Sequence, residues 1–189
     1  MSPERADAIR HRRAVLDAAA ALVGRNGAAG LRMADVARDA GVGPGTVYRG
    51  FAGRSELLLA LLDDTERELQ EALLRGDPPL GPGGPPAPRL LAFIEALHEL
   101  TVRQLDVLIA ADAGSPQAAR RTGAHQAWRL HVSLLLSELR PEADADILAE
   151  LLLAALAAPV QAHLLDDRRK PLTAVRGEIL RLAHAVAQA

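Results

Sequence analysis

The side chains best suited to chemistry near the N-terminus are a hydroxyl, a guanidinium and the only phenol of the chain, all within four residues: Thr46, Arg49 and Tyr48. All three can hydrogen-bond a phosphate oxygen, and Thr46 and Arg49 can also reach a base edge. The sequence contains no nucleophile elbow, phosphate loop, dinucleotide fingerprint or metal-binding His/Glu repeat. The pattern therefore favours nucleic-acid binding over catalysis. In the alternative interpretation, Tyr48 is a core residue and Arg49 a solvated surface residue.

Two short helices joined by a glycine turn are predicted to position these side chains. Met33 and Val36 have helical spacing, Gly41 permits a tight turn, and Pro44 suits the first turn of a second helix. The pattern predicts helices over residues 33–40 and 44–50, and such a unit can place its second helix in the major groove of DNA. The spacing alone indicates only a helical hairpin, which many other helical proteins contain.

Residues 15–58 resemble the DNA-binding domain of the TetR family of repressors. The matching landmarks are residues 15–19 (VLDAA), Gly27, 35–37 (DVA), 40–42 (AGV), 45–48 (GTVY), Phe51, Arg54 and the pair Leu57-Leu58. The resemblance implies a homodimer that binds double-stranded operator DNA, represses transcription, and leaves the DNA when a small effector binds. The residues expected to contact DNA are Arg32, Pro44, Thr46, Tyr48, Arg49 and Arg54.

Two positions depart from the family pattern. Arg32 stands where the family usually has a threonine that caps the second helix, and its side chain has no oxygen with which to cap. Gly50 replaces a residue that is often histidine, which removes a phosphate contact. Because Pro44 and Gly45 offer no side-chain hydrogen bonds, we expect sparse base readout, supplemented by apolar contact and DNA shape.

The composition predicts an all-α fold. Aromatic residues make up only 2% of the chain, so the core must consist mainly of Leu, Ala and Val, of which Leu and Ala are strong helix formers. The absence of cysteine excludes disulfides and cysteine zinc sites. We expect no metal and no cofactor. The longest apolar run, residues 151–160, is half of what a membrane span needs, and no signal peptide is evident, so a cytoplasmic protein without membrane contact is expected.

The charges are distributed unevenly along the chain. Residues 1–54 carry nine arginines and five acids, whereas residues 55–189 carry thirteen basic and nineteen acidic residues. A basic head on an acidic body suits a DNA-binding domain joined to a second domain. A chance fluctuation would produce the same asymmetry.

We predict a helix-turn-helix domain over residues 1–53 and a helical effector-binding and dimerisation domain over 54–189. The N-terminal helices are expected at 5–25, 33–40, 44–50 and 54–75, and the later ones at 88–112, 116–139, 142–167 and 171–187. Residues 77–88 contain six prolines and three glycines, which predicts an extended, exposed linker. Pro159 should kink the helix that contains it.

The second half carries weaker signals. Its aromatic residues, with the histidines and leucines on the same helical stripes, are predicted to line a pocket for a small, mostly apolar effector: Phe93, Leu97, His98, Trp128, His131 and Leu135. The family resemblance implies a four-helix dimer interface, for which the expected residues are Leu153, Val160, Val175, Ile179, Leu182 and Val186. Alternatively, these helices belong to the core of a monomer, and Trp128 is a core residue.

The leading functional hypothesis is a DNA-binding transcriptional regulator rather than an enzyme. The alternative is an all-helical ligand-binding or enzymatic bundle protein without DNA binding. A purely structural helical module would not explain the basic head.

Overall fold

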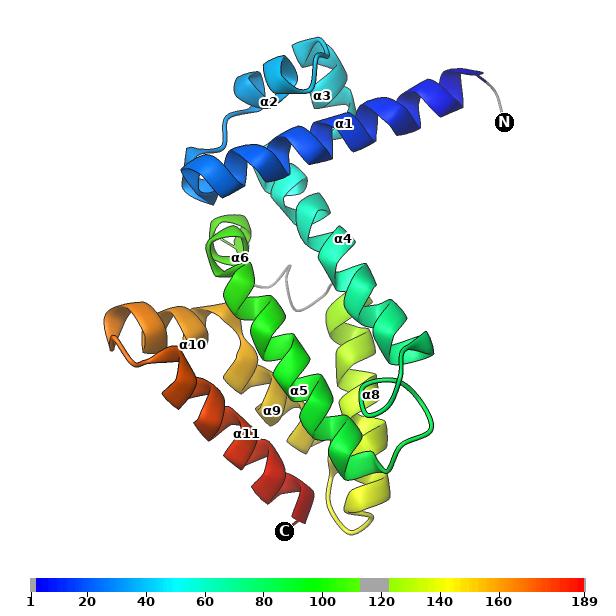
Figure 1. Cartoon of the computed structure of the whole chain (residues 1–189), viewed down its shortest axis with the longest axis vertical. Helices are drawn as coiled ribbons and strands as arrows, with labels where there is room; N and C mark the ends of the chain where they lie inside the picture. Colours follow the sequence, from blue (N-terminus) through cyan, green and yellow to red (C-terminus); the bar gives the residue numbers. More distant parts are fainter. Residues whose placement is uncertain (1–2, 113–122, 189) are drawn as a thin grey trace. The chain divides into compact units, whose positions relative to one another are not determined.

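The computed structural model describes residues 3–112 and 123–188. Every regular element among them is helical, which confirms the predicted all-α fold (Figure 1). The described residues divide into two compact units. Unit 1 contains the stretch up to Asp64 together with the segment that begins at Asp106, and unit 2 contains the stretch from Thr65 to Leu105 together with the C-terminal helices.

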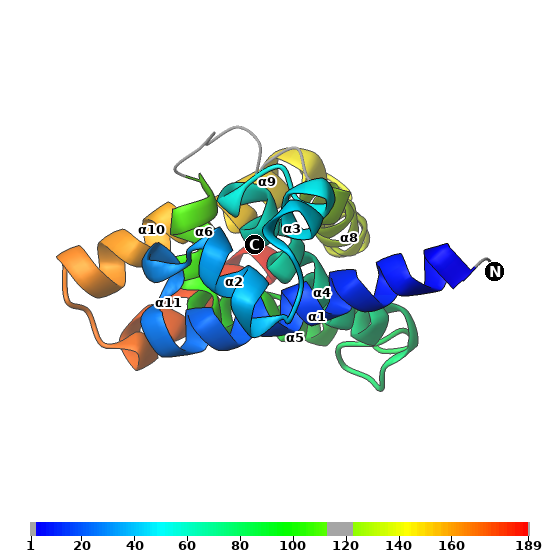
Figure 2. The same cartoon turned by 90° about the horizontal axis from the view of Figure 1, so that it is seen from above.

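Unit 1 is built on the helices predicted at the N-terminus. Its elements are α1 (Pro3–Asn26), the short 3-10 helix η1 (Ala28–Gly30), α2 (Met33–Asp39), α3 (Pro44–Gly50), the first part of α4 (Arg54–Arg75) and α6 (Leu105–Asp112). The bounds of the first four predicted helices agree with the structure to within two residues. In Figure 2, α2 and α3 lie beside α1, whose N-terminal turns extend beyond them.

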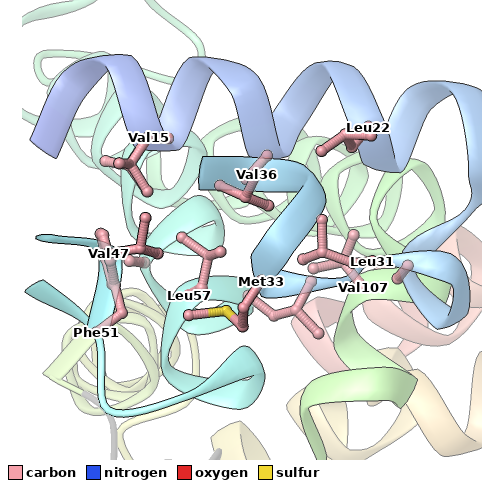
Figure 3. Close-up of a cluster of buried hydrophobic side chains, with 14 of the residues drawn as sticks. Val15, Leu22, Leu31, Met33, Val36, Val47, Phe51, Leu57 and Val107 are labelled. Atoms are coloured by element: carbon pink, nitrogen blue, oxygen red, sulfur yellow. The ribbon is translucent and has the colours of Figure 1, made fainter. Parts of the chain in front are cut away.

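The core of unit 1 joins all of these helices. Val15 and Leu22 of α1 meet Val36 of α2, Val47 of α3 and Leu57 of α4 in one buried cluster (Figure 3). Val107 and Ala111 of α6 complete the cluster, although α6 follows α5 in the chain. The packing therefore groups residues 54–64 and α6 with the helix-turn-helix, whereas the sequence predicts a domain boundary between residues 53 and 54.

The core of unit 2 forms where the other helices of the unit pack on the helix of residues 86–103. Its elements are the rest of α4, α5 (Pro86–Arg103), α8 (Gly123–Leu139), α9 (Ala145–Leu156), α10 (Ala158–Ala162), the π-helical turn η2 (His163–Asp167) and α11 (Leu172–Gln188). The core is made of α5 residues such as Leu90, Phe93 and Ile94, packed with residues of α8, α9 and α11. The predicted helix over 116–139 begins outside the described residues, and α8 is its described part.

The predicted kink at Pro159 is a complete break between α9 and α10. Ala157 has extended backbone angles, φ −61° and ψ 138°, and α10 begins after it. Because Pro159 has no N–H, it cannot donate to the carbonyl of Ala155. The Nε2 of Gln161 donates to that carbonyl at 2.7 Å instead. Gln161 is fully buried, and its Oε1 lies 3.2 Å from Nε2 of His98 on α5.

The linker is more compact than predicted. Its residues form successive turns, Gly81 is buried, and Leu80 packs against the core of unit 2. A Cβ at Gly81 would lie 1.8 Å from the carbonyl oxygen of Gly76, so this close approach requires glycine. The prediction of an extended linker as far as residue 88 was wrong in its last part as well, because Pro86 begins α5 at a position that suits proline.

Two further expectations about the second half are corrected by burial and backbone geometry. The helix predicted over 88–112 is interrupted at Gln104, which separates α5 from α6. Three predicted dimer-interface residues are core residues of the same chain, because Leu153, Val175 and Ile179 are each less than 9% exposed. The apolar stripe of the last helix, predicted to face a partner helix, faces the core in part, because α11 buries Val175 and Ile179 together with Ala183 and Ala187.

The other three predicted interface residues differ from one another. Val160 and Leu182 are 40% and 45% exposed, and Val186 is partly buried against the core of unit 2. No single helix among the described residues is long and apolar enough to cross a membrane. The bent pair of α9 with α10 and η2 reaches that length and composition only together, with a bend of 44°.

Candidate nucleic-acid interface

The turn between α2 and α3 has the geometry that the sequence predicts. Gly41 adopts a left-handed conformation with φ +66°, which a residue with a side chain rarely adopts. The N–H of Val42 then donates to the carbonyl of Ala37 at 3.0 Å, and Pro44 begins α3. Val47 is buried in the core of unit 1 and fixes which side of α3 faces outward.

Thr46, Tyr48 and Arg49 lie on the outer part of α3. Tyr48 is 57% exposed, so the alternative of a core tyrosine is wrong. Arg49 is exposed and donates from Nη2 to Oγ1 of the half-buried Thr46 at 3.2 Å. Pro44 is exposed at the N-terminal end of the same helix. Unit 1 thus presents a phenol, a guanidinium and a hydroxyl to solvent on one short helix.

The arginines of unit 1 differ in whether their charge is already paired. Arg25 and Arg38 both form ion pairs with Asp39 on α2, and Arg10 pairs with Asp7. Arg32 and Arg49, by contrast, have no carboxylate partner among the described residues. Arg32 precedes α2 and makes no side-chain capping bond, as expected from its chemistry. Its exposed, unpaired charge is available to a polyanion.

Arg54 has a different environment from the other predicted contact residues. It is half-buried, and its Nη2 donates to the carbonyl of Ala28 in η1 at 2.6 Å. The N–H of Ala28 donates in turn to Oδ2 of Asp106 on α6 at 3.0 Å. Arg54 therefore holds η1 in place within unit 1, and its predicted contact with the DNA backbone stays a prediction.

Arg12 on α1 is a further basic residue beside α3, and the sequence does not predict its contacts. Its guanidinium lies 4.5 Å from the centroid of the Phe51 ring, and its Nη1 donates to the carbonyl of Gly50 at 3.3 Å. These contacts join α1 to the C-terminal end of α3. The basic run at residues 10–13 (RHRR) was the available signal, because a helix that carries so many cations beside a DNA-binding helix is itself a candidate for phosphate contact.

The predicted effector residues come together in unit 2 on α5 and α8. Leu97, His98 and Leu135 are buried, and Trp128 is half-buried. The ring of Phe93 meets the ring of His131 edge to face, with centroids 5.0 Å apart. The described residues contain no group of three or more histidines and acids that could hold a metal ion.

Burial lowers the pKa of both histidines in this region. For His98 the loss of hydration outweighs its hydrogen bond to Gln161, and for His131 the nearby Arg89 guanidinium lowers the pKa further. Both imidazoles are therefore neutral near pH 7. Because Nε2 of Gln161 donates to Ala155, its Oε1 must accept from His98, which places the His98 proton on Nε2.

Comparisons with known proteins agree with this geometry. Residues 15–61 match the pattern of the family described as "Bacterial regulatory proteins, tetR family". The chain is similar to the HTH-type transcriptional regulator BetI of Agrobacterium fabrum, with 36% identity over 72 residues. That match covers 36% of this chain and 35% of the relative, so the chain spans about a third of the length of the curated relative that it matches.

Solved structures extend the likeness to the whole fold. A transcriptional regulator of the TetR/AcrR family from Thermobifida fusca YX-ER1 superposes with a TM-score of 0.68 at 21% identity, covering 92% of this chain and 96% of that one. FadR from Bacillus subtilis, solved in complex with stearoyl-CoA, superposes with a TM-score of 0.60 at 16% identity, covering 92% and 98%. The chain therefore has an N-terminal domain similar to that of the tetR family of bacterial regulatory proteins, and it shares the all-helical fold of these solved structures.

Proposed function

We propose that this protein is a transcriptional regulator that binds double-stranded operator DNA through α3 and the residue that precedes α2. The observation that carries the proposal is the outward placement of Tyr48, Arg49 and Arg32 on a helix-turn-helix of this family. Arg32 and Arg49 lack carboxylate partners within the described residues, so phosphate binding would not require an existing ion pair to break. No residue is assigned a catalytic role, and the cytoplasm is the proposed location.

The DNA-binding proposal is tested by capture of mixed genomic fragments on filters at low and high salt. We expect enrichment of a near-palindromic sequence with half-sites about one helical turn, roughly 34–36 Å, apart or somewhat more. The variant Arg49→Ala should lose affinity, whereas Arg38→Ala should not, because Arg38 is already paired with Asp35 and Asp39. Equal enrichment by both variants and the parent would contradict the assignment of α3.

The proposed active form is a homodimer formed through exposed apolar residues of unit 2. Ile147 and Leu151 are 58% and 62% exposed and lie one turn apart on α9. Val160 on α10 and Leu182 on α11 are exposed as well. Side chains of this size gain free energy when a partner covers them. Sedimentation should give twice the mass of the 20.0 kDa chain at micromolar concentration.

A small, mostly apolar molecule is the proposed effector, and α5 and α8 are its proposed site. Support comes from the convergence of Phe93, Trp128 and His131 in unit 2. Helix α4 contributes residues to both units, and we propose that effector binding changes its orientation and with it the spacing of the two recognition helices. A hundredfold loss of operator affinity would need a coupling free energy of about 2.7 kcal/mol.

A further inference from the structure

Four buried polar atoms on the α5–α8 side of unit 2 have no hydrogen-bond partner. Within the described residues, these are Nε of Arg89, Nδ1 of His98, Nε1 of Trp128 and Nε2 of His131. Protein interiors normally satisfy such atoms, and several unsatisfied ones in one region call for a ligand or another physical reason. All four belong to residues of α5 or α8, and three of the four residues had been predicted from the sequence to line a pocket.

Two of these atoms can only donate. The indole N–H of Trp128 and the Nε–H of Arg89 have no lone pair to offer, so each needs an oxygen or another acceptor. The described residues supply none, because no hydrogen bond or ion pair connects the Arg89 side chain or the Trp128 indole to another group. Within the described residues, the Nε–H of Arg89 and the indole N–H of Trp128 therefore have no acceptor, and no carboxylate pairs with the Arg89 guanidinium.

Arg89 is also the group that sets the charge in this region. Burial lowers the pKa of His131, and the Arg89 guanidinium is close enough to lower it further, so this imidazole stays neutral. The nearby ring of Phe93 is apolar and packs edge to face on His131. One unpaired cation, with a neutral imidazole beside it, suits a single negative charge better than the two charges of a phosphate monoester.

The surroundings of these groups are apolar. Phe93, Leu97 and Leu135 are each no more than 3% exposed and belong to the core of unit 2. Arg–carboxylate pairs are short and directional, and they gain strength where water is excluded. A ligand for this site therefore needs a carboxylate at one end and an apolar tail at the other.

We propose that the effector is an apolar-tailed monocarboxylate whose oxygens accept hydrogen bonds from Arg89 and Trp128 between α5 and α8. This inference rests on the effector site proposed above and names the chemical class of its ligand. Because Nε of Arg89 and Nε1 of Trp128 are buried, binding must part side chains of the two helices to reach them, and the new hydrogen bonds to these atoms favour that rearrangement.

The test uses the full-length protein without DNA, with the emission of Trp128, the only tryptophan, as the readout. Octanoate and phenylacetate are titrated beside their uncharged counterparts, 1-octanol and phenylacetamide. We expect a saturable change in emission with at least one carboxylate, at a concentration at least tenfold lower than for its counterpart. Failure of both carboxylates to change the emission, or equal affinity for acid and neutral compound, would overturn the proposal.

Substitutions test whether Arg89 is the cation that binds the carboxylate. Arg89→Gln should weaken carboxylate binding at least tenfold and leave binding of the neutral compounds unchanged. Arg103→Gln is the matched control, because Arg103 is an exposed arginine at the end of the same helix. If Arg89→Gln does not fold, calorimetric titration of Trp128→Phe serves instead, with an expected loss of several-fold for the carboxylate alone. Unchanged carboxylate affinity in either folded variant would refute the assignment.

The readouts separate this inference from the proposed function. Carboxylate binding is measured on the free protein and does not depend on an operator. Filter capture of genomic fragments by Arg89→Gln should equal that of the parent when no carboxylate is present. Loss of DNA binding in every form of the protein would contradict the regulator proposal, while carboxylate selectivity that depends on Arg89 would still stand.

Discussion

Replacing Gln161 with leucine tests how the break between α9 and α10 is stabilised. Gln161 is fully buried, donates to the Ala155 carbonyl at 2.7 Å, and accepts from His98 at 3.2 Å. Leucine has a similar volume but can do neither, so Gln161→Leu leaves a carbonyl and an imidazole N–H without partners. Each orphaned group costs about 1–3 kcal/mol, and the additional apolar burial of leucine offsets about 1–2 kcal/mol.

The expected net loss is therefore about 2 kcal/mol in the free energy of unfolding. For a chain of this length, that loss corresponds to a decrease of about 4–8 °C in Tm. Thermal unfolding followed by circular dichroism at one fixed protein concentration measures it, because any dimer would make Tm depend on concentration. The exposed Gln126 on α8 provides the matched control, and Gln126→Leu should leave Tm unchanged.

A double-mutant cycle tests whether His98 is a stabilising hydrogen-bond partner of Gln161. His98→Leu leaves the Gln161 oxygen without its donor, whereas the double variant His98→Leu/Gln161→Leu leaves only the Ala155 carbonyl unsatisfied. The two losses should therefore sum to more than the loss in the double variant. Losses that simply add, or a Gln161→Leu variant as stable as the parent, would show that these hydrogen bonds do not stabilise the break.

The remaining predictions concern DNA binding, assembly and pH. Tyr48→Phe should weaken binding to all DNA sequences about tenfold or more in filter binding at matched salt. The reason is that a hydrogen bond to a charged phosphate contributes about 1.5–3 kcal/mol. Unchanged affinity would show that Tyr48 does not contact the DNA. Leu182→Glu should give folded monomers in sedimentation, because Leu182 is 45% exposed. Ile179→Glu should unfold unit 2 instead, because Ile179 is only 8% exposed. A Leu182→Glu variant that is folded and dimeric would place the interface elsewhere. Burial lowers the pKa of His98 and His131, so at pH values below their unfolded pKa of 6.5 the unfolded chain binds more protons than the folded chain. The free energy of unfolding should therefore fall as pH decreases through that range. Replacing both histidines with glutamine should flatten the dependence of Tm on pH between 7.5 and 5.5.

The helix-turn-helix could be predicted closely because local rules determine it. Gly41 is needed for a left-handed turn, Pro44 suits the start of a helix, and the spacing of Val36 and Val47 identifies the buried side of each helix. Each of these constraints acts within a few residues, so it is visible in the sequence. The bounds of the N-terminal helices follow from the same local signals.

The second half could be predicted less well because its constraints are tertiary. The stripe of Val175 and Ile179 is equally apolar whether it faces the core of its own chain or a partner, and only the packing of α11 in unit 2 distinguishes the two. Likewise, the compact linker depends on the close approach of Gly81 to Gly76, which composition does not reveal. A run rich in proline and glycine predicts irregular structure but not its degree of exposure.

The same limitation explains why the predicted domain boundary differs from the packing of unit 1. Ala28, in the short helix before α2, is held on both sides: its carbonyl accepts from Arg54 of α4, and its N–H donates to Asp106 of α6. Within the described part of the chain, α4 and the junction of α5 with α6 are the two stretches that lead from unit 2 into unit 1. Both stretches therefore bring a hydrogen-bonding side chain to the backbone of one residue, Ala28, just before the helix-turn-helix. A displacement of α6 relative to α4 would have to break one of these bonds or move η1, and η1 is joined to α2 only through Leu31 and Arg32.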